Sequence, residues 1–86
     1  MIQTTYDERN DVLLVFRDGH MVTHSREGDD PYLILDHEGD ATVGARLICA
    51  AMMPWLYWSQ HPDRASIPTD VLAAMDGWIA ANGRAS

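Results

Sequence analysis

The chain of 86 residues contains no lysine, and its six arginines are spread singly along it. A protein that binds DNA or RNA directly needs clustered positive charge to displace the counterions of the phosphates. This chain instead has 13 acidic residues and a formal net charge of -7. Direct nucleic-acid binding is therefore excluded from the expected functions.

Cysteine is nearly absent as well. Cys49 is the single cysteine, so the chain cannot form an internal disulfide. No charged start with an apolar signal core precedes the first expected strand, and the longest apolar run, residues 47–53, is far too short to cross a membrane. We therefore expect a cytoplasmic protein without a membrane span.

The sequence does not lack the apolar residues needed for folding. Its hydrophobic content of 47% is ordinary for a folded globule and disfavours disorder. The length predicts a single domain over residues 1–86, with a sheet half at 1–49 and a tryptophan-rich segment plus helix at 50–86. Because so small a domain buries a modest share of its surface, we expect a partner or a second copy of the chain to add stability.

The negative charge is uneven along the chain. Ten of the 13 acidic residues, but only four of the six arginines, precede Cys49. A negatively charged sheet half suits a basic protein partner. The alternative explanation is that the acidity serves solubility alone.

Turn-forming residues divide residues 1–48 into four or five expected strands. Residues 12–16 are almost continuously apolar, as in a central strand, and shorter strands are expected at 1–5 and 21–26. Residues 32–48 read as two strands around a polar turn that includes Asp36, Glu38 and Asp40. The short connections favour an antiparallel β-meander.

The second half of the chain predicts helical structure. Residues 49–58 favour a short helix or 3₁₀ turn, and residues 71–82 favour a helix capped by Ser66 or Thr69. That helix places one apolar stripe toward the sheet, formed by Val71, Leu72, Met75, Trp78 and Ile79. The expected fold class is therefore α+β: an antiparallel β-meander of four or five strands covered by a C-terminal helix.

Residues 4–49 resemble a small bacterial family catalogued as domain of unknown function twenty-two eighty-three. The resemblance lies in Tyr6-Asp7, in Asp11 followed by the apolar strand to Phe16, in Leu35-Asp36 with Gly39, and in Val43-Gly44. Arg46 departs from the family, which commonly has an acidic residue there. The resemblance implies a fold and no catalytic residues. It also implies an antitoxin-like role, since family members look like antitoxins of small toxins.

Histidine and cysteine offer few catalytic or metal-binding patterns. His20 and His24 are four residues apart, but two imidazoles do not complete a zinc site, and nothing in the spacing brings His61 or Cys49 to them. The turn from Asp36 to Asp40 lacks the glycine position and distal glutamate of a calcium loop. We expect no cofactor and no catalytic residue, and a small metal protein or enzyme using these histidines or Cys49 remains the third alternative.

The aromatic block after Cys49 is the strongest functional signal. Tryptophan, tyrosine and methionine are enriched at the buried centres of interfaces, although the same residues can cover a sheet as core. We predict a protein-binding module, in its finer form an antitoxin-like neutraliser of a small basic toxin; a structural homodimer is the second alternative. The predicted partner-binding residues are Met53, Trp55, Tyr57 and Trp58, with the acidic Asp36, Glu38 and Asp40.

Overall fold

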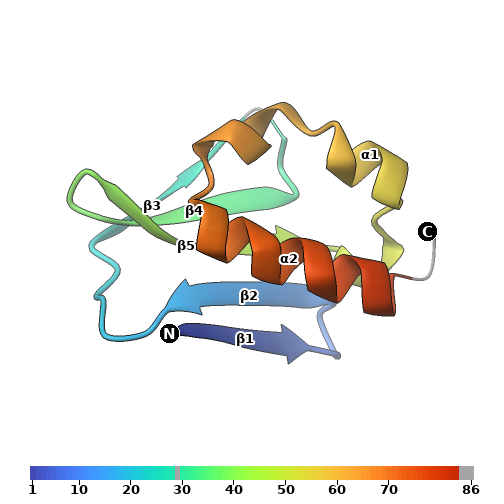
Figure 1. The fold of residues 1–86 in the computed structure, drawn as a ribbon, viewed down its shortest axis with the longest axis horizontal. Coiled ribbons are helices and arrows are strands. Elements are labelled where there is room, and N and C mark those ends of the chain that lie inside the picture. Colours follow the sequence, from blue (N-terminus) through green and yellow to red (C-terminus); the bar gives the residue numbers. More distant parts are fainter. Residues whose placement is uncertain (29, 84–86) are drawn as a thin grey trace.

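A computed structural model describes residues 1–28 and 30–83, in which five strands form one antiparallel sheet. The strands are β1 (Ile2–Asp7), β2 (Val12–Arg17), β3 (His24–Glu27), β4 (Leu33–Glu38) and β5 (Ala41–Ile48). The expected α+β class, with a C-terminal helix against the sheet, is confirmed (Figure 1).

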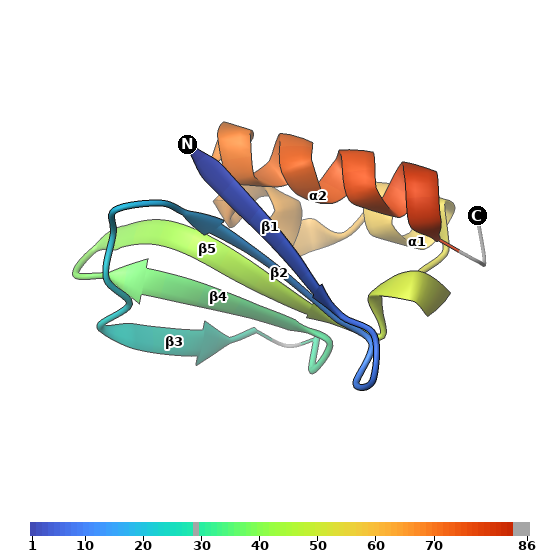
Figure 2. The same cartoon turned by 90° about the horizontal axis from the view of Figure 1, so that it is seen from below.

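The strand order is β1-β2-β5-β4-β3, so the chain does not follow one continuous meander. β3, β4 and β5 follow each other as a meander, and β5 then pairs with β2, which places the two most apolar strands in the sheet centre. The connection of residues 18–23, which we call the crossover, passes along the end of the sheet from β2 to β3. It places β3 at the edge opposite β1 (Figures 1 and 2).

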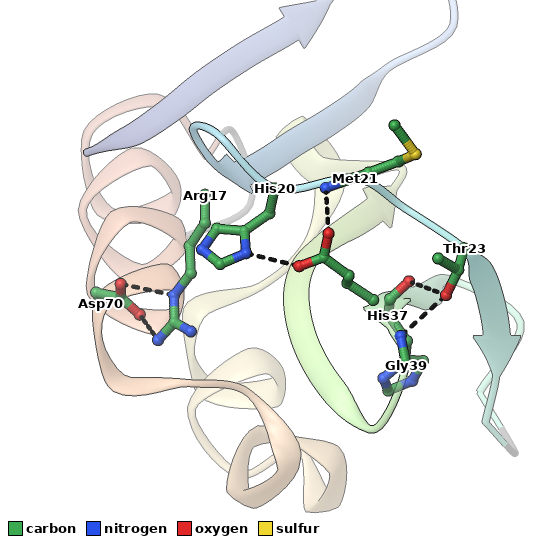
Figure 3. A network of polar contacts seen from close by, with 8 residues as sticks. Arg17, His20, Met21, Thr23, His37, Gly39 and Asp70 are labelled. Atoms are coloured by element: carbon green, nitrogen blue, oxygen red, sulfur yellow. Dashed lines mark hydrogen bonds and ion pairs between the residues drawn. The ribbon is translucent and has the colours of Figure 1, made fainter.

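Side-chain contacts hold this connection in place. Glu38 on β4 accepts hydrogen bonds from the His20 ring, at 2.9 Å, and from the Met21 backbone N–H, also at 2.9 Å. Thr23 continues the attachment, because its hydroxyl donates to the His37 carbonyl and accepts from the Gly39 N–H (Figure 3). The polar turn predicted around Glu38 therefore holds the crossover between the two parts of the sheet.

Two strand boundaries differ from the sequence prediction. β1 continues through Asp7, because Tyr6 and Asp7 pair with Leu13 and Val12 and the turn needs only residues 8–11. β3 begins at His24 rather than at residue 21, since the preceding residues form the crossover.

The helical half consists of η1 (Ala50–Met52), α1 (Trp55–Ser59), η2 (Pro62–Ser66) and α2 (Thr69–Asn82). α2 lies across β1, β2 and β5 on one face of the sheet (Figure 2). The predicted cap at Ser66 or Thr69 is wrong, because the residue before the helix is Pro68 and its first turn has no side-chain cap. No helix in the described part of the chain is long and apolar enough to cross a membrane.

The core lies between the helical half and one face of the sheet. From the sheet it contains Leu13, Val15, Leu33, Leu35 and Leu47, and from the helices Trp58, Val71, Met75 and Ile79. The opposite sheet face carries half-buried Leu14, Phe16 and Ile34 around Arg46, and no described helix covers it (Figure 2). Phe16 packs so closely over Gly44 that a Cβ there would lie 3.0 Å from its ring.

Candidate protein-binding site

A group of large apolar side chains is exposed where β5 leads into the helical half. We call it the α1 surface, and its residues are Tyr32, Met52, Trp55, Leu56 and Tyr57. Their exposed fractions range from 39% for Trp55 to 69% for Leu56. The three aromatic residues alone leave roughly 280 Å² accessible, given about 200 Å² for each ring system.

The local sequence explains why these side chains point outward. Pro54 precedes α1, and its carbonyl accepts the first helical hydrogen bond from the Trp58 N–H at 2.9 Å. α1 has only five residues, so a single turn offers one position directed at the core, and Trp58 occupies it. Trp55, Leu56 and Tyr57 remain on the outer side.

Trp58 and Met53, two of the predicted partner-binding residues, are buried in the core of the folded chain. Trp58 is fully buried and Met53 is 5% exposed. The Trp58 indole N–H donates to Asp76 on α2 at 2.7 Å, and the Arg64 guanidinium lies over its ring. The predicted aromatic block therefore divides: Trp55 and Tyr57 belong to the exposed surface, whereas Trp58 and Met53 hold α1 to the molecule.

A cavity of about 450 Å³ opens beside the α1 surface. Its lining is apolar or aromatic, without a charged residue, and consists of Tyr32, Cys49, Met52, Met53, Pro54 and Tyr57. Cavities of this volume and lining accept an apolar side chain or a small apolar ligand. Here the cavity is flanked by exposed rings, so it suits an anchor residue of a larger partner.

A second cavity, of about 420 Å³, shares Tyr32 and Tyr57 with the first and is lined by acidic groups. Asp30 accepts hydrogen bonds from the Tyr32 N–H at 2.8 Å, from His61 Nε2 at 2.5 Å and from the Tyr57 hydroxyl at 3.3 Å. Burial raises the pKa of Asp30, but these hydrogen bonds outweigh it, and the pKa lies below its ordinary value. The charge of Asp30 in turn raises the pKa of the Tyr57 hydroxyl.

The three predicted acidic contact residues lie elsewhere. Asp36 is 3% exposed and accepts hydrogen bonds from Arg46 at 2.9 Å and from Ser25 at 2.6 Å on the open sheet face. Glu38 holds the crossover, and of the three acidic residues only Asp40 is exposed. The turn of residues 39–40 stands at the opposite end of the sheet from α1 (Figure 1). The predicted acidic and aromatic parts are thus two separate surfaces.

The histidines are engaged in structural contacts. The rings of His24 and His37 stack across β3 and β4 with centroids 5.0 Å apart, and His20 binds Glu38. Within the described residues, no three histidine, cysteine or acidic side chains come close enough to hold a metal ion. Cys49 lines the apolar cavity and has a left-handed backbone with φ 60°.

Tyr32 and Leu56 of the α1 surface, and Asp30 and Asp63 beside it, were not predicted as site residues. The sequence shows Asp30 only as part of a chain break before Pro31. Its neighbours Tyr57 and His61 are 27 and 31 positions away, so only the tertiary fold brings the groups together. The one local feature that could have indicated a binding site here is an aromatic residue, Tyr32, directly after the Asp30-Pro31 pair, and this feature is weak.

Comparisons of the chain with protein-family models, with curated proteins and with solved structures find no significant match. The resemblance of residues 4–49 to domain of unknown function twenty-two eighty-three therefore stays a prediction.

Proposed function

We propose that the protein is a binding module that docks a basic protein partner on the α1 surface. The supporting observation is that Trp55, Leu56 and Tyr57 stay outside the core, although the sheet is already covered by Trp58 and α2. Exposed aromatic and aliphatic residues around a cavity are the arrangement of an interface anchor. A role in covering the sheet does not account for them.

Charge favours a basic partner. The chain carries a net charge of -7, and Asp30 and Asp63 border the α1 surface directly. The arginine nearest in sequence, Arg64, is bound to Asp76 through hydrogen bonds of 2.6 and 3.0 Å. An acidic rim around an apolar centre speeds association with a positively charged surface and disfavours acidic competitors.

The test compares two double variants of the full chain. Met52→Gln with Leu56→Gln changes two side chains of the α1 surface that are 57% and 69% exposed. Met21→Gln with Val22→Thr is the matched control, because these residues are also exposed but lie in the crossover between β2 and β3. Each protein captures partners from a lysate of the native host at low salt, and the captured protein is then purified and titrated calorimetrically.

We expect the α1-surface variant to bind the purified partner at least about thirtyfold more weakly, since losing interface anchors removes about 2 kcal/mol or more. The crossover variant should bind like the unchanged chain. Equal affinity of both variants, or a capture that recovers only this chain, contradicts the proposal.

An antitoxin-like activity is the finer form of this proposal, supported by the family resemblance and by the acidity of the chain. Neutralisation of a small basic toxin would use the α1 surface as its docking site. Co-expression with such a toxin, encoded next to this chain, tests the idea through rescue of growth. Rescue by the unchanged chain and by the crossover variant, but not by the α1-surface variant, is the expected result.

A further inference from the structure

The two cavities beside α1 differ in chemistry and share a wall. Tyr32 and Tyr57 line both of them, with the apolar cavity of Cys49 and Met52 on one side and the cavity of Asp30 and Asp63 on the other. Because one pair of rings separates them, the cavities can receive neighbouring side chains of a single extended segment. Side chains two residues apart point to the same side of such a segment.

The acidic cavity contains the carboxylates of Asp30 and Asp63 and the His61 ring. His61 Nδ1 accepts a hydrogen bond from the Asp63 N–H at 3.1 Å, so the ring proton is on Nε2 and is donated to Asp30. Both ring nitrogens of His61 are thus engaged within the chain, so neither is free to bind a further group in this cavity. The Asp63 carboxylate accepts no hydrogen bond among the described residues. Two carboxylates therefore line this cavity, and no arginine of the described residues lines it.

We infer that the paired cavities bind a segment of the partner in which an apolar side chain fills the Cys49 cavity and an arginine, two residues away, fills the Asp63 cavity. This inference rests on the proposed function and specifies its partner. Arginine fits better than lysine, because its planar guanidinium stacks on tyrosine rings and pairs with carboxylates through two hydrogen bonds. Tyr32 and Tyr57 present their rings at this position, 46% and 53% exposed.

The experiment titrates the isotope-labelled full chain with acetylated, amidated pentapeptides and follows the backbone amide shifts. The probe has the sequence glycine-leucine-serine-arginine-glycine. A second peptide has glutamate in place of arginine, and a third has serine in place of leucine. We expect the probe to bind at least about fivefold more tightly than either. The shifted amides should include those of Tyr32, Cys49 and Asp63.

Matched variants test which cavity is responsible for the preference for arginine and which for the preference for leucine. Asp63→Asn keeps the size of the side chain and should bring the affinities for the arginine and glutamate peptides close together. Met52→Gln should instead reduce the preference for leucine over serine. Asp40→Asn makes the same substitution in the exposed turn at the other end of the sheet, and it should leave both preferences unchanged.

Three results overturn the inference: equal binding of the arginine and glutamate peptides, equal effects of Asp63→Asn and Asp40→Asn, or no binding of any peptide. If one of these results is found but a purified partner still needs the α1 surface for binding, the inferred segment with an apolar residue and an arginine is wrong and the proposed function stands. A partner that ignores the α1 surface removes the proposed function itself.

Discussion

Asp11 and Cys49 are the two described non-glycine residues with a left-handed backbone, at φ 53° and φ 60°. They lie where the sheet meets the start of the helical half. The Asp11 carboxylate accepts hydrogen bonds from the Tyr6 hydroxyl at 2.6 Å and from the Ala51 N–H at 2.9 Å. Its carbonyl accepts a third from the Ala50 N–H. Aspartate tolerates this backbone conformation better than most residues, and here it joins three segments.

Asp11→Ala should lower the free energy of unfolding by about 2 kcal/mol, because two partly buried donors lose their acceptor. Asp11→Asn keeps an oxygen in the same place and tolerates positive φ, so its loss should stay below about 1 kcal/mol. Urea denaturation followed by circular dichroism measures both. A loss with asparagine as large as with alanine would show that the charge matters rather than the acceptor.

At the scale of elements, Asp76 connects three parts of the helical half. From α2 it accepts hydrogen bonds from the Trp58 indole in α1 and from the Arg64 guanidinium in η2. Burial raises the pKa of Asp76, but the bonds from Arg64 and Trp58 outweigh it, so the pKa lies below its ordinary value. A short α1 has little stability of its own, and this contact fixes the helix that carries the α1 surface.

Asp76→Asn should reduce the free energy of unfolding by about 1–2 kcal/mol at neutral pH, since the ion pair is lost while one oxygen remains for Trp58. A lowered pKa in the folded state stabilises the fold above the unfolded pKa, about 3.9 for aspartate, and this contribution disappears as pH falls through the folded value. The difference between the unchanged chain and the variant should therefore be constant above about pH 5 and shrink below about pH 4.

Urea denaturation at several pH values, followed by tryptophan fluorescence, measures this difference. Asp70→Asn serves as the control because Asp70 pairs with Arg17 at the surface, where solvent screens the interaction (Figure 3). It should destabilise the chain less than Asp76→Asn. A difference between Asp76→Asn and the unchanged chain that is the same at pH 3 and pH 7 would contradict the role of the ionised carboxylate.

At the scale of the whole molecule, the net charge of -7 acts in opposite ways on the two proposed binding partners of the α1 surface, a basic protein and a second copy of this chain. A basic partner is attracted, and added salt screens that attraction. A second copy of this chain is repelled, and added salt screens that repulsion. The homodimer predicted as the alternative therefore responds to salt in the opposite direction from the complex with a basic partner.

Raising the sodium chloride concentration from about 50 mM to about 500 mM should weaken binding of the basic partner by about tenfold or more. Over the same range, light scattering of the isolated chain reports self-association. A dimer mass that grows with salt and vanishes in the Met52→Gln, Leu56→Gln double variant would assign the α1 surface to a second copy. Partner binding that strengthens with salt would contradict the role of the acidic rim.

The sequence by itself determined the strands, the helical tail and the apolar stripe of α2, because these depend on patterns within a few residues. Val71, Met75 and Ile79 are buried as their helical spacing requires. It also led to the prediction that the aromatic block binds a partner. It did not determine which tryptophan faces the core, since that depends on how one turn of helix meets the sheet.

Only the tertiary structure decided how distant segments meet. The insertion of β5 between β2 and β4 separates β2 from β3 and places the crossover of residues 18–23 against Glu38. The same arrangement brought Asp30 against Tyr57 and His61, although these residues are about one third of the chain apart in sequence. Strand pairing and side-chain packing act between residues that are remote along the chain, so no local pattern encodes which acids border the exposed aromatic rings.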